Sequence, residues 1–363
     1  MKNIGLYIHV PFCSGKCPYC DFYSVAATEE QMDRYTSYLA DKLASYKGRY
    51  HADTVYFGGG TPSLLGTERL CTLLDAARDA FFSDGEITIE VNPRSAMQLD
   101  FTKLSQHGLN RVSMGLQSAN ERELRLLGRR HTAQSAEEAF IKIKSEGIDN
   151  ISLDLMLGIG GQTENSLARS IDFCASLGAK HISAYILKIE EGTPYFKKRD
   201  SLDLPDEDSV CSLYEYAVER LAKHGYEQYE ISNFAKSGYE SRHNLKYWHC
   251  EEYLGLGPAA HSFIDGKRFF YSRSLDDFYN DISIDDGEGG GIEEYISLAL
   301  RLGEGLVFEK YEARFNDAVP AEYIENAVKL KKTGLVDVND KGITITPKGF
   351  LVSNTLIADI LYG

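Results

Sequence analysis

Short apolar runs alternate with longer amphipathic stretches along the first half of the chain. The short runs are rich in β-branched and aromatic residues and predict six strands, at residues 4–9, 54–57, 87–91, 111–115, 151–155 and 181–186. The stretches between them have apolar residues at helical spacing, which predicts helices at residues 29–46, 68–82, 133–145 and 166–176. This alternation predicts an α/β fold with a parallel sheet. Six successive units favour a partial (β/α)6 barrel, with an open doubly wound sheet as the alternative.

The second half of the chain has a different pattern. A helix is predicted at residues 207–224, followed by an irregular region rich in glycine and aromatic residues up to about residue 274. The acidic, glycine-rich residues 285–291 predict a flexible linker. Beyond it, the pattern predicts a small α+β unit of winged-helix-like layout, with helices at 293–302, 321–333 and 349–361 and a hairpin at 336–338 and 343–346.

These patterns predict three parts of the chain. Residues 1–230 form the core barrel, residues 231–284 a connecting region, and residues 292–363 a C-terminal domain for which we expect a lid or docking role. In each α/β unit, ligand-binding residues are expected at the carboxyl ends of the strands.

Composition excludes some classes of protein. The 363 residues have a net charge of −15, which argues against nucleic-acid binding because phosphate contacts need clustered basic residues. No run approaches the roughly 18 apolar residues of a membrane span, and a predicted strand begins at residue 4, so we expect no signal peptide and a cytoplasmic protein. No basic amphipathic helix supports membrane docking, although peripheral membrane contact stays open.

Three of the seven cysteines lie within eight positions, at Cys13, Cys17 and Cys20. In a reducing compartment such crowding predicts metal or cluster binding rather than disulfides. Three thiolates on one loop can bind three irons of a [4Fe–4S] cluster and leave the fourth iron open to another ligand. Zinc is the alternative, and it would need a fourth ligand such as His9 or Asp21.

The Cys-x3-Cys-x2-Cys spacing on a loop after the first strand resembles the radical S-adenosylmethionine (SAM) superfamily. The resemblance implies a [4Fe–4S] cluster, SAM bound at its open iron, and an electron donor whose electron cleaves SAM. Tyr19, between the second and third cysteines, would shield the cluster and lie against SAM.

Polar residues recur where successive predicted strands end. Glu90, Gln117 and Asp154 hold this position on three strands, and the second strand ends in a run of three glycines at residues 58–60. Singly, such residues are more often helix caps or packed turns, but their repetition at strand ends favours one shared pocket.

Residues 4–350 also resemble one radical SAM family, which contains the oxygen-independent coproporphyrinogen III oxidases and the HemW heme chaperones. The matching segments include residues 108–118, 127–131 and 230–234. Residues 158–163 depart from the family by lacking a proline, for which we expect only a local change of the loop. Matched motif by motif, the resemblance implies SAM contacts from Tyr7, Gly59, Gly60, Thr61, Glu90, Gln117, Arg129 and Asp154.

Three features favour the heme-chaperone branch of this family. The position two residues beyond the triad is Phe22, where the oxidases carry a further cysteine, and no extension precedes the first strand. Residues 243–248 match the His-Asn-x-x-Tyr-Trp segment typical of HemW, which makes His243 the candidate heme ligand, with Cys250 and His261 as alternatives. This branch implies heme and heme-receiving proteins as partners. The alternatives are the radical decarboxylase of coproporphyrinogen III and a radical SAM enzyme with another substrate.

Overall fold

The six predicted strands are present and form one parallel sheet in the computed structural model, which describes residues 1–363. Each strand pairs in parallel with the next. They are β1 (Lys2–Val10), β2 (Tyr50–Gly59), β3 (Glu86–Val91), β4 (Arg111–Gln117), β5 (Asn150–Leu157) and β6 (His181–Ile186). The sheet does not close on itself, because β6 continues to β8 and β1 to β9. The predicted partial barrel is therefore confirmed.

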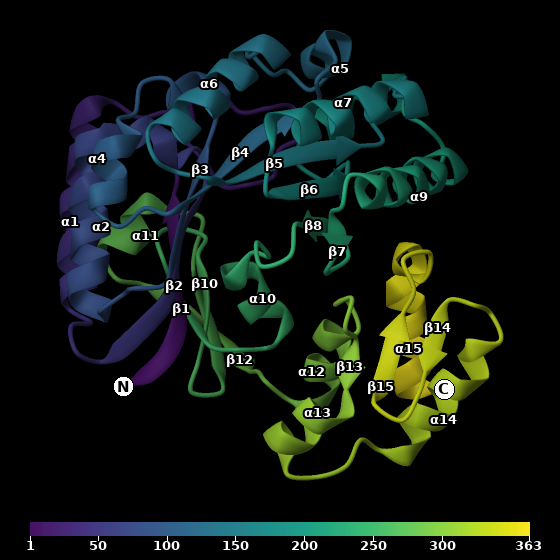
Figure 1. The fold of residues 1–363 in the computed structure, drawn as a ribbon. Helices are drawn as coiled ribbons and strands as arrows, with labels where there is room; N and C mark the ends of the chain where they lie inside the picture. Colours follow the sequence, from purple (N-terminus) through teal and green to yellow (C-terminus); the bar gives the residue numbers. More distant parts are fainter.

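An outer layer of helices covers this sheet (Figure 1). Successive helices contact one another, α1 with α2, α2 with α4, α6 with α7 and α7 with α9. Their buried faces are the apolar stripes that predicted them, and threonine capping boxes start α1, α6 and α7. The helices of the barrel are α1 (Glu29–Ala44), α2 (Gly66–Phe81), α3 (Pro93–Ala96), α4 (Phe101–Gln106), α5 (Glu121–Leu126), α6 (Ala133–Ser145), α7 (Glu164–Leu177), α8 (Pro194–Lys197) and α9 (Glu207–Lys223).

The region predicted to be irregular contains further strands, so that prediction is wrong. β9 (Tyr253–Leu256) pairs in parallel with β1, and β10 (His261–Ile264), β11 (Lys267–Tyr271) and β12 (Ser283–Glu288) extend the sheet in antiparallel fashion. At the other edge, β7 (Glu227–Gln228) and β8 (Asn233–Ala235) pair beside β6. The helices α10 (Arg242–Trp248) and α11 (Leu275–Tyr279) lie between these strands in sequence.

Half of the predicted linker at residues 285–291 also belongs to a strand. Every residue of β12 is exposed, so the strand buries no side chain. An edge strand of this kind has no apolar alternation, which is why the sequence pattern could not show it.

The C-terminal unit is a small α+β structure that contains the predicted hairpin. β14 (Val336–Val338) and β15 (Gly342–Ile345) pair in antiparallel fashion, and β13 (Leu306–Val307) pairs on the other side of β15. Its helices are α12 (Ile292–Ala299), α13 (Phe308–Phe315), α14 (Ala321–Lys331) and α15 (Ser353–Tyr362). In Figure 1 this unit lies below α9 and beside α10. No helix of the structure has the length and apolar character needed to cross a membrane.

Candidate cofactor cavity at the strand ends

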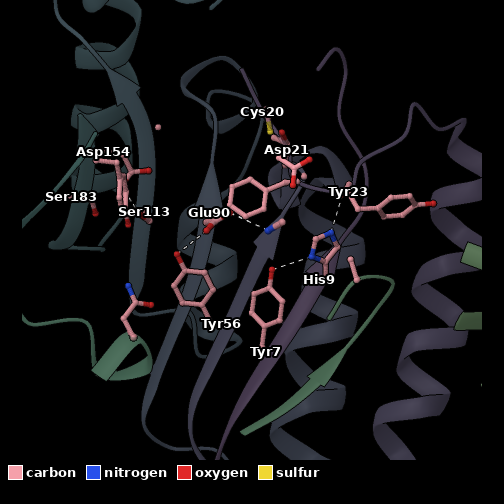
Figure 2. A pocket seen from close by; sticks show the side chains of 18 of the residues that line it. Tyr7, His9, Cys20, Asp21, Tyr23, Tyr56, Glu90, Ser113, Asp154 and Ser183 are labelled. Carbon is pink, nitrogen blue, oxygen red and sulfur yellow. Dashed lines mark hydrogen bonds between the residues drawn. The ribbon is translucent and has the colours of Figure 1, made fainter. Parts of the chain in front are cut away.

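A cavity of about 1000 Å³ opens at the carboxyl ends of the parallel strands. Its wall includes Cys20 and side chains from successive strands (Figure 2). Cys20 lies at the end of the loop between β1 and α1 that carries Cys13, Cys17 and Cys20, here called the Cys loop. All nine residues expected to contact SAM line this one cavity, namely Tyr7, Tyr19, Gly59, Gly60, Thr61, Glu90, Gln117, Arg129 and Asp154. Residues that are up to 147 positions apart in sequence thus meet where the parallel topology predicts a ligand site.

The three cysteines lie on the loop between β1 and α1, and all three are free and partly buried. Backbone hydrogen bonds from Cys13 to Val25 (3.0 Å) and from Val25 to Pro11 (2.8 Å) fix the base of this loop. No three His, Cys, Asp or Glu side chains of the protein form a group suited to a single metal ion.

The glycines at the end of β2 let this strand pack directly against the Cys loop. Gly60 N–H donates to the carbonyl of Val10 (2.8 Å) and Thr61 N–H to that of Phe12 (2.8 Å). A Cβ atom on Gly60 would lie 2.5 Å from the Phe12 carbonyl oxygen, and one on Gly59, whose φ is +104°, would lie 2.6 Å from the His9 ring. Glycine is required at positions 59 and 60 because the neighbouring chain packs closely against them, and this packing fixes the position of the Cys loop relative to the sheet.

Two buried carboxyl groups face the cavity from neighbouring parts of the sheet. Glu90 accepts hydrogen bonds from the Tyr56 hydroxyl (2.9 Å) and Gly59 N–H (3.2 Å), and burial raises its pKa from 4.5 to about 7. Asp154 accepts a hydrogen bond from Ser113 Oγ (3.2 Å), and burial likewise raises its pKa. The sequence pattern does not predict Tyr56 and Ser113 as site residues, because a single hydroxyl inside a strand gives no signal.

Arg129 connects the Cys loop to the fourth strand. Its Nη2 donates to the Gly115 carbonyl (2.7 Å), and its Nη1 lies 3.6 Å from the Cys17 sulfur. The buried Nε has no hydrogen-bond partner in the protein. An unpaired buried donor at the wall of a cavity is a site for an anionic or carbonyl group of a ligand.

The two candidates for a fourth zinc ligand are already engaged by other groups. One ring nitrogen of His9 lies 3.1 Å from the Tyr7 hydroxyl and the other 3.0 Å from the Tyr23 carbonyl oxygen. Asp21 forms an ion pair with Arg273 (2.9 Å). This arrangement disfavours His9 as a fourth zinc ligand, because both of its ring nitrogens are engaged inside the protein.

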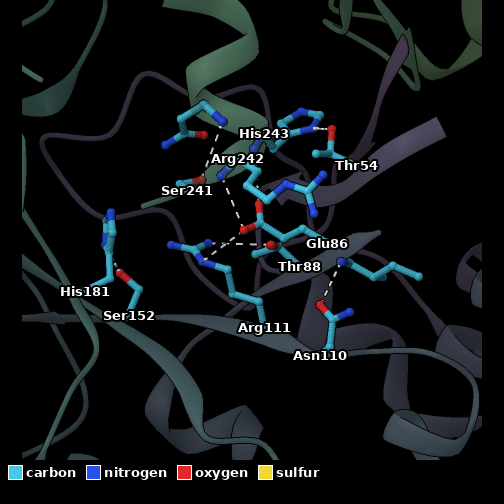
Figure 3. A network of polar contacts seen from close by, with 12 residues as sticks. Thr54, Glu86, Thr88, Asn110, Arg111, Ser152, His181, Ser241, Arg242 and His243 are labelled. Carbon is cyan, nitrogen blue, oxygen red and sulfur yellow. Dashed lines mark hydrogen bonds and ion pairs between the residues drawn. The ribbon is translucent and has the colours of Figure 1, made fainter. Parts of the chain in front are cut away.

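His243, the candidate heme ligand, does not line the cavity. It is 1% exposed on α10, and its ring nitrogens lie 2.9 Å from Thr54 Oγ1 and 2.8 Å from the Tyr247 hydroxyl. Around it lies a polar network at the amino ends of the strands, in which Glu86 accepts from the backbone N–H of His243 (3.1 Å) (Figure 3). In this structure His243 therefore holds α10 against the barrel, and neither ring nitrogen is free to bind iron.

The two alternative heme ligands lie in different places. Cys250 is buried away from this cavity, beside a smaller pocket next to Arg314. His261 is exposed at the start of β10 and lines the large cavity.

Comparison with protein families assigns both parts of the chain. Residues 7–174 match the radical SAM superfamily and residues 292–352 match the HemN C-terminal domain. The heme chaperone HemW of Lactococcus lactis is 32% identical over 99% of this chain and 98% of its own length. That of Mycobacterium tuberculosis is 34% identical over 99% of this chain and 95% of its own.

The chain belongs to the HemW family of radical SAM proteins.

Other relatives agree with this assignment. A bovine mitochondrial protein named for its radical SAM domain is 30% identical to this HemW-family chain, over 99% of the chain and 88% of the relative. Among solved structures, the coproporphyrinogen III oxidase HemN of Escherichia coli superposes with a TM-score of 0.81. This superposition covers 99% of the HemW-family chain and 90% of HemN at 23% identity, and it shows a shared fold.

Proposed function

We propose that this protein is a heme chaperone that binds a [4Fe–4S] cluster, SAM and heme, and passes heme to recipient proteins. The observation that carries the proposal is the convergence of the Cys loop and all nine SAM candidates on one cavity. The second support is the relation to heme chaperones along nearly the full chain. All seven cysteines are free in the structure, which supports a protein of the reducing cytoplasm.

Cys13, Cys17 and Cys20 would hold the cluster. Soft thiolates on one short loop fit iron–sulfur chemistry, and the Arg129 guanidinium beside Cys17 would stabilise the negative charge of a thiolate-bound cluster. When bound, the cluster supplies the electron that cleaves SAM, and an external donor must restore it. Tyr19, which lies between the second and third cysteines and lines the cavity, would cover one side of the cluster.

The cavity wall offers SAM complementary groups at each of its polar ends. The free Nε of Arg129 would meet a carboxylate, to which a planar guanidinium is suited. Asp154 and Glu90 accept hydrogen bonds and would bind ammonium or hydroxyl donors. Gln117 and Thr61 would add neutral contacts, and Tyr7 would close the floor beneath them.

Anaerobic reconstitution followed by heme titration tests this function. We expect saturable binding of one heme per chain, seen in the Soret band, while a parallel reaction with SAM and a reductant leaves coproporphyrinogen III unconverted. Conversion of the porphyrinogen would instead support the oxidase alternative, and absence of both activities would favour a radical SAM enzyme with another substrate. Heme loss from the loaded protein to a heme-free acceptor, here apomyoglobin, should depend on whether the cluster and SAM are present.

A further inference from the structure

One wall of the cavity is not used by the SAM candidates. Those candidates lie on β1 to β5 and on the loops that follow them, whereas another part of the wall comes from the end of β6 and the segment after it, from β10, and from β11 with the residues that follow it. This outer wall consists of Ile186, Lys188, His261, Phe270, Tyr271 and Arg273. A volume of about 1000 Å³ is at the upper end of single small-molecule sites, so the cavity has room for a second ligand beside SAM.

Three histidines line the cavity, and they differ in whether their ring nitrogens are free. His9 is bonded to Tyr7 and the Tyr23 carbonyl. His181 has Ser152 Oγ 2.7 Å from Nδ1 and the Tyr229 hydroxyl 2.8 Å from Nε2. His261 makes no side-chain hydrogen bond at all: its ring is stacked on Phe270, with centroids 4.9 Å apart and planes at 20°. Only His261 therefore presents an uncommitted imidazole to the cavity.

The outer wall also exposes apolar side chains that a flat ligand could cover. Phe22, directly beyond the Cys loop, is 65% exposed, and Ile186 at the end of β6 is 41% exposed. Phe270, on β11, also lines the cavity. Exposed apolar side chains that gather around one cavity mark a binding surface for an apolar partner, in contrast to single apolar residues scattered on a surface.

Two cations stand at this wall in a protein with a net charge of −15. Arg273 pairs with Asp21 at 2.9 Å, and its side chain is 61% exposed. Lys188 pairs with Glu190 at 2.7 Å and is 80% exposed. Exposed pairs of this kind contribute roughly 0 to 1 kcal/mol, so a carboxylate of a ligand can compete for either cation.

We propose that heme binds at this outer wall, with His261 as the axial ligand of its iron. The macrocycle would lie against Phe270 and Phe22, and its two propionates would meet Arg273 and Lys188. Neutral imidazole is a good ligand for heme iron, and guanidinium and ammonium groups are suited to carboxylates. This inference rests on the proposed function, and it places heme beside SAM in one cavity instead of at the His243 network.

The test is a heme titration of the reconstituted full-length protein and of three variants. His261→Ala should weaken heme binding by at least about tenfold, because it removes the iron's protein ligand. His261→Cys should restore binding with the absorption and electron-paramagnetic-resonance spectra of thiolate-ligated ferric heme, a change that a merely structural role would not produce. The control His51→Ala removes a partly buried histidine at the opposite end of β2, and it should bind heme like the wild type.

The outcomes separate this inference from the proposed function. Wild-type heme affinity and spectra in both His261 variants would overturn the heme site while leaving the chaperone function intact. Loss of heme binding in His51→Ala as well would also overturn it, since the effect would then not be specific to the cavity. Absence of heme binding by the wild type would overturn the proposed function itself. Cluster absorbance and SAM affinity, measured on every variant, should be unchanged and show that each one is folded.

Discussion

The two ends of the partial barrel both bring polar side chains together, yet they differ in what those groups face. At the amino ends of the strands, Glu86 on β3 accepts a hydrogen bond from the His243 backbone N–H, and the His243 ring is hydrogen-bonded to Thr54 on β2. These contacts fix α10 in place (Figure 3). At the carboxyl ends, Glu90 and Asp154 face a cavity (Figure 2), and the buried Arg129 Nε at its wall has no hydrogen-bond partner. Polar groups that pack against the protein's own elements stabilise the fold, whereas polar groups that line a cavity are available to a ligand.

His243 and His261 show why this difference matters. His243 belongs to the more distinctive sequence motif, but both of its nitrogens are used inside the protein. His261 lies in a glycine-rich segment outside that motif, and its ring has no hydrogen-bond partner at the cavity wall. A histidine's chemistry is thus decided by its remaining hydrogen-bonding capacity, which only the three-dimensional arrangement shows.

The largest effect is expected at the carboxyl end, on the Cys loop. Replacing Cys13, Cys17 or Cys20 with Ser should abolish the oxygen-sensitive visible absorbance after anaerobic reconstitution, because a hydroxyl does not replace a thiolate on iron. Cys211→Ser, on α9, removes a partly buried thiol outside this loop and should keep the absorbance. Intact absorbance in all three loop variants would show that the cluster is held elsewhere.

At the amino end, Glu86→Ala should destabilise the fold without a direct effect on ligands. It leaves Arg111, which is 2% exposed and 4.0 Å from the Glu86 carboxylate, buried without its counter-charge. Breaking a buried pair in this way costs about 3 kcal/mol, measurable by urea unfolding of the apoprotein. Glu68→Ala, which breaks an exposed pair with Lys103, should cost less than about 1 kcal/mol. Equal losses in the two variants would mean that the amino-end network is not stabilising.

His243→Ala sharpens the comparison between the two histidines. Loss of its contacts with Thr54 and Tyr247 should lower the free energy of unfolding by about 2 kcal/mol, because both hydroxyls lose a buried partner. The heme affinity of the folded variant should equal that of the wild type, opposite to His261→Ala. A loss of heme affinity with unchanged stability would instead make His243 the ligand.

The same variant should alter the dependence of stability on pH. Burial lowers the pKa of His243 from 6.5 to about 3. Between pH 6.5 and about 3, the unfolded chain therefore binds a proton at this residue and the folded chain does not. The contribution of the neutral His243 to the free energy of unfolding is fully present above pH 6.5 and is lost as the pH falls toward 3. In urea unfolding across this range, the free energy of unfolding should fall less steeply with decreasing pH for His243→Ala than for the wild type. Identical pH slopes of the two proteins would contradict the buried neutral imidazole.

The sequence predicted the parts of the molecule that have a strong local signal. The six parallel strands follow from their apolar runs, and Glu90, Gln117 and Asp154 follow from their place at successive strand ends, whereas the other cavity residues were implied by the family resemblance. β12 escaped prediction because it buries nothing, and β9 to β11 because glycines and aromatics mask their alternation. The relative merits of His243 and His261 depend on partners more than 180 positions away, such as Thr54 beside His243, and no local pattern carries that information.

The smallest effect concerns Glu90, whose carboxyl titrates near neutrality at the carboxyl end. With its pKa raised from 4.5 to about 7 by burial, Glu90 is mainly protonated at lower pH and mainly ionised at higher pH. The ionised form only accepts hydrogen bonds, and it should bind the hydroxyl donors of SAM better. SAM affinity should therefore rise by up to about tenfold between about pH 6 and about pH 8.

The matched variant for this prediction is Glu90→Gln, which keeps the shape of the side chain and removes its titration. SAM affinity measured by equilibrium dialysis should then show the rise in the wild type and lack this component in the variant. The amino group of SAM titrates in both proteins, so only the difference between the two pH profiles reports on Glu90. Parallel pH profiles of SAM affinity in the two proteins would show that Glu90 does not contact SAM. The role of this part of the cavity wall would then be structural, like that of the network around His243.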